Sequence, residues 1–104
     1  MLFFVILHAA QEPTGAALCV GLDPDPARLP APLADLPAHE AVVRFNRAIV
    51  EATADIACAY KPNLAFYEAL GTDGWRALEA TLEAIPENRL TIADGKRGDI
   101  GNTA

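Results

Sequence analysis

Four charged residues near the C-terminal end of the chain have types and spacing suited to acid–base chemistry. They are Asp94, Lys96, Arg97 and Asp99, within the stretch DGKRGD. Asp94 and Lys96 are two residues apart, so in an extended chain they share one side. A lysine among carboxylates stays protonated, and such a row provides a proton donor in a preorganised electrostatic site. Asp99 lies beyond a glycine and need not face the same pocket, while Arg97 is expected to point outward or to pair with an acidic neighbour.

Two other charged residues stand at the ends of short apolar runs. Runs near 16–22, 57–61 and 90–94 have the length and composition of buried strands. Because ligands bind at the carboxyl ends of parallel strands, charged residues at these ends should converge on one edge. A solvated row of ion pairs without a catalytic role remains the alternative. The residues expected to converge are Asp23, Lys61, Asp94 and Lys96.

Amphipathic helices are expected between these strands. The spacing predicts a helix over 38–56, a helical turn over 64–70, and a helix over 73–85 with Thr72 as its N-cap. Another short apolar helix is expected at 3–10. The order predicts an α/β fold with parallel strands, and both a doubly wound sheet and a (β/α)₈ barrel begin this way. The apolar stripes are Val42, Phe45, Ile49, Ala52 and Ile56 on the first long helix, and Trp75, Leu78, Leu82 and Ile85 on the second.

Composition argues against several classes of partner. The net charge is −6 with a pI near 4.7, so no basic surface for nucleic acid is expected. The N-terminal apolar run is too short to span a membrane, which takes about 20 residues. Cys19 and Cys58 lie in apolar runs and are expected to be buried free thiols, a pattern that suits a reducing cytoplasm.

Four segments resemble the bacterial long-form branch of the orotidine 5′-phosphate decarboxylases. They are Leu18–Asp25, Phe45–Ile49, Ala59–Glu68 and Ile92–Thr103, and the resemblance runs over residues 17–104 in the family's order. It implies the N-terminal part, about three βα units, of a (β/α)₈ TIM barrel, so that residues 1–104 form an incomplete barrel domain. It also implies conversion of orotidine 5′-monophosphate to UMP in pyrimidine biosynthesis, without metal or organic cofactor.

The resemblance also assigns roles to individual residues. Lys96 would protonate C6 as carbon dioxide leaves, and Asp94 would crowd the substrate carboxylate. Asp23 and Lys61 would hold ribose hydroxyls. Two further residues would reach across a homodimer into the partner's site. The implied catalytic residues are Lys61, Asp94, Lys96 and Asp99, the substrate-binding residues are Asp23, Lys61 and Thr103, and the residues that cross the dimer are Asp99 and Thr103.

The chain departs from the family pattern in two ways, and two other functions stay open. Gly95 stands where the family usually has alanine, and 104 residues fall short of the about 250 of such a barrel. The chain alone is therefore expected to fold poorly or aggregate and to be inactive. Magnesium-dependent sister enzymes, hexulose-phosphate synthase or keto-gulonate-phosphate decarboxylase, share D-x-K-x-x-D, although the segment 60–63 argues against them. A non-catalytic structural or dimerisation module is the other alternative.

Overall fold

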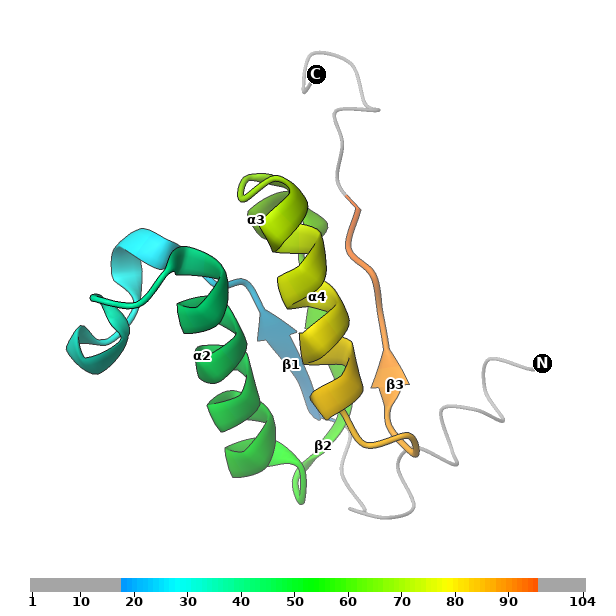
Figure 1. Cartoon of the computed structure of the whole chain (residues 1–104). Coiled ribbons are helices and arrows are strands. Elements are labelled where there is room, and N and C mark those ends of the chain that lie inside the picture. The colour runs from blue at the N-terminus through cyan, green and yellow to red at the C-terminus, as the bar shows by residue number, and fades with distance from the viewer. Residues whose placement is uncertain (1–17, 96–104) are drawn as a thin grey trace.

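The computed structural model describes residues 18–95, which form a parallel sheet with helices packed on one face (Figure 1). The sheet has three strands in the order β1-β2-β3. They are β1 (Leu18–Leu22), β2 (Ala57–Pro62) and β3 (Leu90–Thr91). Both pairings are parallel, which confirms the α/β fold expected from the order of elements. The helix expected at 3–10 lies outside the described residues.

The connections between the strands carry the helices. Two short 3-10 helices, η1 (Pro26–Arg28) and η2 (Ala31–Leu33), follow β1 and precede α2 (Ala38–Thr53). After β2 come α3 (Leu64–Glu68) and α4 (Thr72–Ala84). The prolines between β1 and α2 favour short turns over a longer helix, because proline cannot donate the backbone hydrogen bonds that a helix interior needs.

The core lies between the sheet and the helices. Leu22 of β1 and Tyr60 of β2 are buried there against Val50 of α2 and Ile85, which directly follows α4. Successive side chains of a strand point to opposite faces. Gly21, the neighbour of Leu22, and Lys61, the neighbour of Tyr60, therefore belong to the face of the sheet away from the helices.

The buried face of α2 differs from the expected stripe. Ala52 is exposed, and Ile56 lies beyond the end of α2 at Thr53 with half of its surface accessible. Phe45 and Ile49 lie at the margin of the core. A buried polar residue, Asn46, occupies the centre of the face because its amide is hydrogen-bonded there. The buried residues are Ala41, Val42, Asn46 and Val50.

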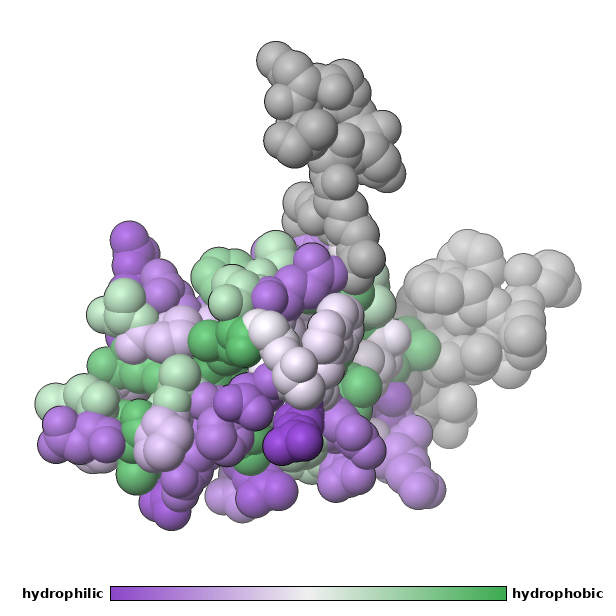
Figure 2. Space-filling model, turned by 45° about the horizontal axis from the view of Figure 1, so that its top comes forward, coloured by the Kyte–Doolittle hydropathy of each residue, from purple (hydrophilic) through white to green (hydrophobic). Residues whose placement is uncertain are grey.

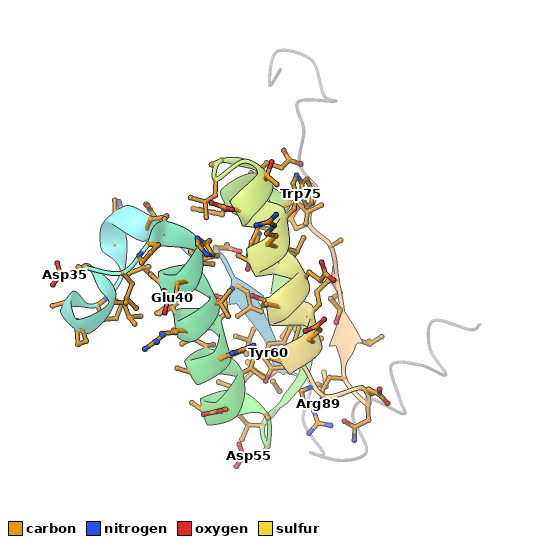
Figure 3. The ribbon with its side chains drawn as sticks, in the orientation of Figure 1. Asp35, Glu40, Asp55, Tyr60, Trp75 and Arg89 are labelled. Carbon is orange, nitrogen blue, oxygen red and sulfur yellow. The ribbon has the colours of Figure 1, made fainter. Side chains whose placement is uncertain are left out.

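The start and the buried face of α4 also differ from expectation. Gly71, with φ of 67°, is the N-cap, and Thr72 is the first helical residue. Small residues of α4 allow close packing on α2 and α3, which turns two large apolar side chains of the expected stripe to one flank. We call these two, Trp75 and Leu82, the α4 apolar flank; they are 46% and 41% exposed. Figure 2 shows hydrophobic patches reaching the surface among hydrophilic residues, and Figure 3 shows Trp75 on the outside of α4.

The two cysteines have different environments. Cys58 is buried, whereas Cys19 is exposed, and both are free thiols. Cys19 alternates with the core-facing Val20 and so belongs to the face of β1 that no described helix covers. The expectation of burial was therefore right for Cys58 and wrong for Cys19.

Arg89 ties together the end of the sheet opposite the charged strand ends (Figure 3). Its Nε donates a hydrogen bond to the carbonyl of Ala57 at 2.9 Å, and its Nη2 donates to the carbonyl of Ala54 at 2.6 Å. Ala54 is the C-cap of α2, where carbonyls lack partners within the helix. A single guanidinium thus joins the end of α2, the start of β2 and the residue before β3.

Replacing Arg89 by alanine is expected to lower the free energy of unfolding by about 2 kcal/mol, because two carbonyls lose charged hydrogen-bond donors. Arg76→Ala is the control, since Arg76 is exposed and only 3.9 Å from Asp73; it should cost at most about 0.5 kcal/mol. Urea unfolding measures both stability losses in the complete gene product. By this term we mean the translation product of the whole reading frame that encodes residues 1–104. Equal effects of the two substitutions would contradict the role given to Arg89.

Candidate functional site at the carboxyl edge of the sheet

Pairing between the strands places the expected charged residues at one edge of the sheet. Gly21 pairs with Lys61, and Leu22 pairs with Pro62, so Asp23 follows at the end of β1 beside the end of β2. An isolated parallel bridge joins Asn63 to Asp94. Asp23, Lys61 and Asp94 therefore lie at the carboxyl ends of three neighbouring strands, as the sequence predicted.

Asp23 and Lys61 share the face of the sheet that lies away from the helices. A Cβ built on Gly21, whose side is opposite to that of the core residue Leu22, would lie 3.9 Å from both carboxylate oxygens of Asp23. The Asp23 carboxylate is thus next to Gly21, and Gly21 is paired with Lys61. Since Gly21 has no side chain, it places no side-chain atom between the Asp23 carboxylate and β2, the strand that carries Lys61.

Both backbone polar groups of Asp94 are hydrogen-bonded to the segment that joins β2 to α3. Its N–H donates to the carbonyl of Pro62 at 3.0 Å, and its carbonyl accepts from the N–H of Leu64 at 2.9 Å. Leu64 is the first residue of α3, and the N-cap Asn63 accepts from Ala65 N–H through its side chain. The start of α3 therefore fixes the position of Asp94 relative to the end of β2.

A buried hydrogen-bond network, absent from the expectations, lies behind Asp23. The Asn46 amide nitrogen donates to the Tyr67 hydroxyl at 2.9 Å and to the Thr81 hydroxyl at 3.0 Å. Tyr67 in turn donates to the Leu22 carbonyl at 3.1 Å, and Thr81 donates to the Ala77 carbonyl at 2.7 Å. The one sequence signal was polar residues on otherwise apolar helix faces, at Asn46 and Thr81.

Burial raises the pKa of Tyr67 from 10.0 to about 12; the Asn46 hydrogen bond opposes this rise, and the negative charge of Asp23 adds to it. The raised value in the folded state means that ionisation of Tyr67 favours unfolding. Its contribution to stability is fully present below pH 10 and is lost as the pH rises through about 12.

The unfolding free energy of the complete gene product is expected to fall more steeply above pH 10 than that of its Tyr67→Phe variant, since the variant lacks this group. Chemical unfolding at a series of alkaline pH values measures both slopes. Parallel slopes would show that the Tyr67 hydroxyl ionises alike in the folded and unfolded states.

The carboxylates of Asp23 and Asp94 lie at strand ends on either side of β2, which carries Lys61. Such a group of charges can bind a polyhydroxylated ligand and can repel a ligand carboxylate placed near Asp94. Lys96, Asp99 and Thr103 lie outside the described residues.

Within residues 18–95, no group of three or more His, Cys, Asp or Glu side chains is arranged to hold a metal ion. In that same part of the chain no helix is long and apolar enough to cross a membrane.

Comparison with known proteins gives consistent similarities. Residues 16–104 match the sequence model of the Orotidine 5′-phosphate decarboxylase / HUMPS family. The chain is 53% identical over 104 residues to the orotidine 5′-phosphate decarboxylase of Herpetosiphon aurantiacus, covering 99% of this chain and 38% of that protein. It is 52% identical to its counterpart in Dehalococcoides mccartyi strain BAV1, covering 100% of this chain and 36% of that protein.

A solved structure shows the same likeness in three dimensions. The OMP decarboxylase of Leishmania donovani superposes with a TM-score of 0.71 at 36% identity, over 97% of this chain and 36% of that one. The chain thus spans little more than a third of the length of these relatives. These overlaps confirm the expected N-terminal part of a (β/α)₈ barrel.

Proposed function

Since the chain belongs to the orotidine 5′-phosphate decarboxylase / HUMPS family, we propose that the complete gene product converts orotidine 5′-monophosphate to UMP. The observation that carries this proposal is the grouping of Asp23, Lys61 and Asp94 at one edge of the sheet. Relatives about 50% identical are named for this activity. In this proposal the protein is a cytoplasmic enzyme of pyrimidine biosynthesis that uses neither metal nor organic cofactor.

The proposed chemistry breaks one carbon–carbon bond. The substrate carboxylate at C6 lies near Asp94, and repulsion between the two anions is relieved as neutral carbon dioxide leaves. The electron pair of the broken bond stays on C6 and takes a proton from the Lys96 ammonium group. Asp23 and Lys61 hold the ribose hydroxyls, so that C6 of the pyrimidine stays in line with the Lys96 ammonium group.

The proposal includes a second subunit. Asp99 and Thr103 would extend from one protomer into the site of the other in a homodimer. A chain limited to residues 1–104 would lack the parts of the site that the relatives carry in their remaining length. Its α4 apolar flank and its unpaired strand edges would also be uncovered. Such a chain is therefore expected to be inactive.

The test is an assay of the complete gene product and of residues 1–104 alone with orotidine 5′-monophosphate, with and without a chelator. Turnover by the complete product that persists with chelator supports the proposal. Loss of orotidylate turnover in chelator would contradict the proposed metal-free chemistry. Magnesium-dependent turnover of a sugar phosphate, without turnover of orotidylate, would favour a magnesium-dependent sister enzyme instead. Absence of turnover in a folded complete product would refute the proposed activity.

A further inference from the structure

The segment after β1 has few backbone donors with which to hold its position. Leu22 ends the strand, and the next four residues are Asp23, Pro24, Asp25 and Pro26. Proline has no N–H, so this segment cannot continue a regular strand ladder. The side chain of Asp25 is used locally, where it accepts from the N–H of Ala27 at 3.0 Å. A hydrogen bond at Leu22 is therefore important for the position of Asp23.

The Tyr67 hydroxyl supplies this hydrogen bond from a fixed direction. Its ring is fully buried, and its oxygen donates to the Leu22 carbonyl while accepting from the Asn46 amide. Asn46 is in turn held by Thr81 of α4. Residues from α2, α3 and α4 are thus linked in one set of hydrogen bonds, of which the bond from Tyr67 reaches the Leu22 carbonyl, directly before a residue of the candidate site.

The helix that carries Tyr67, α3, also bonds to the backbone of Asp94, the second carboxylate of the candidate site. α3 is five residues long, and its first N–H, that of Leu64, bonds the Asp94 carbonyl at 2.9 Å. Three residues later Tyr67 bonds the Leu22 carbonyl. This helical turn therefore links the segment that follows β3 to the end of β1, and Lys61 of β2 lies three residues before its first residue, Leu64.

We infer that Tyr67, supported by Asn46 and Thr81, is a positioning residue that holds the Asp23 carboxylate in register with Lys61 and Asp94 for substrate binding. The hydroxyl acts through the Leu22 carbonyl and does not touch substrate. This inference rests on the proposed function, because Asp23 is the group taken to bind the ribose. It assigns to α3 the role of setting the separation between the two carboxylates.

The chain contains a matched control for this role. Tyr60 is as fully buried as Tyr67. Its hydroxyl lies 2.8 Å from that of Thr53 and donates to the Val50 carbonyl at 3.4 Å. Those partners lie in the last turn of α2, away from the carboxyl edge. Tyr60→Phe and Tyr67→Phe remove the same atom from comparable surroundings and differ in their connection to Asp23.

In the complete gene product, Tyr67→Phe is expected to lower kcat/KM by about tenfold, mainly through KM, because a displaced Asp23 weakens substrate binding. Tyr60→Phe should change kcat/KM by less than about threefold. In an Asp23→Asn background, Tyr67→Phe should cost less than about twofold more, because the group it positions is already lost. Equal losses for the two tyrosine variants, or a full tenfold loss in the Asp23→Asn background, would overturn the inference.

Two further measurements keep the test decisive. If Tyr67→Phe does not fold, Thr81→Val replaces it, since that change releases Asn46 and leaves the tyrosine in place; its kcat/KM loss should also vanish in the Asp23→Asn background. Amide hydrogen exchange of the segment 18–25 is read independently of activity. Exchange there should be faster in Tyr67→Phe than in Tyr60→Phe, and equal rates would refute the positioning role. A complete product without decarboxylase activity would refute only the proposed function.

Discussion

Replacing Lys96 by alanine is expected to reduce decarboxylation by the complete gene product by at least about a thousandfold. The lysine is proposed both to donate the proton to C6 and to balance the negative charge that develops there, and general acid catalysis alone is worth about 10² to 10⁴. Steady-state turnover of orotidine 5′-monophosphate measures the loss, and binding of the product UMP checks that the variant still forms its site.

Two neighbouring substitutions separate charge from proton donation. Lys96→Arg keeps the positive charge, but a guanidinium does not give up its proton in proteins, so this variant should stay almost inactive. Arg97→Ala removes the adjacent cation, which is expected to lie outside the pocket, and should keep activity within about threefold. Substantial turnover in both Lys96 variants would sink the proton-donor assignment.

The second large effect concerns a glycine inside a helix. Gly74→Ala is expected to destabilise the complete gene product by more than about 3 kcal/mol, because the core would have to move to admit one methyl group. A Cβ at Gly74 would overlap the Tyr67 carbonyl oxygen and lie 2.7 Å from its carbon and 3.0 Å from the Leu70 Cβ. Backbone atoms of α3 cannot turn aside as a flexible side chain can.

The sign of this effect is informative. Helix propensity alone predicts that Gly→Ala stabilises a helix by about 1 kcal/mol, so steric overlap and propensity predict opposite shifts in the unfolding midpoint. Ala48→Ser, which adds one atom at an exposed position of α2, should cost only about 0.5 kcal/mol. Urea unfolding compares the variants with the wild type. A stabilised Gly74→Ala variant would show that α3 and α4 are not packed this closely.

The edge of the sheet was predictable because the signals for it are local. Continuous apolar runs define buried strands, and their order along the chain requires parallel crossovers. Once the strands are parallel, residues at their carboxyl ends must meet, which brings together Asp23, Lys61 and Asp94. The catalytic and binding roles of all these residues stay predictions, as do those of Lys96, Asp99 and Thr103, which lie outside the described residues.

The packing between helices was not predictable in the same way. Sequence periodicity ranks large apolar residues as buried, yet Trp75 and Leu82 are exposed because α4 packs through small residues such as Gly74. Asn46 and Thr81 are buried only because their partners come from other elements. Such contacts join residues 21 and 35 positions apart in sequence. The sequence shows polar residues on apolar helix faces, but it does not show which partners they meet.

Two bonds that hold the Asp94 backbone join main-chain atoms, those of Pro62 and Leu64. Side chains at those two positions can therefore vary in evolution without changing the bonds that fix the Asp94 backbone. Asp23 is held differently, through the side chain of Tyr67. The backbone of Asp94 is thus buffered against sequence drift in these two bonds, whereas the position of Asp23 depends on the conservation of a tyrosine hydroxyl.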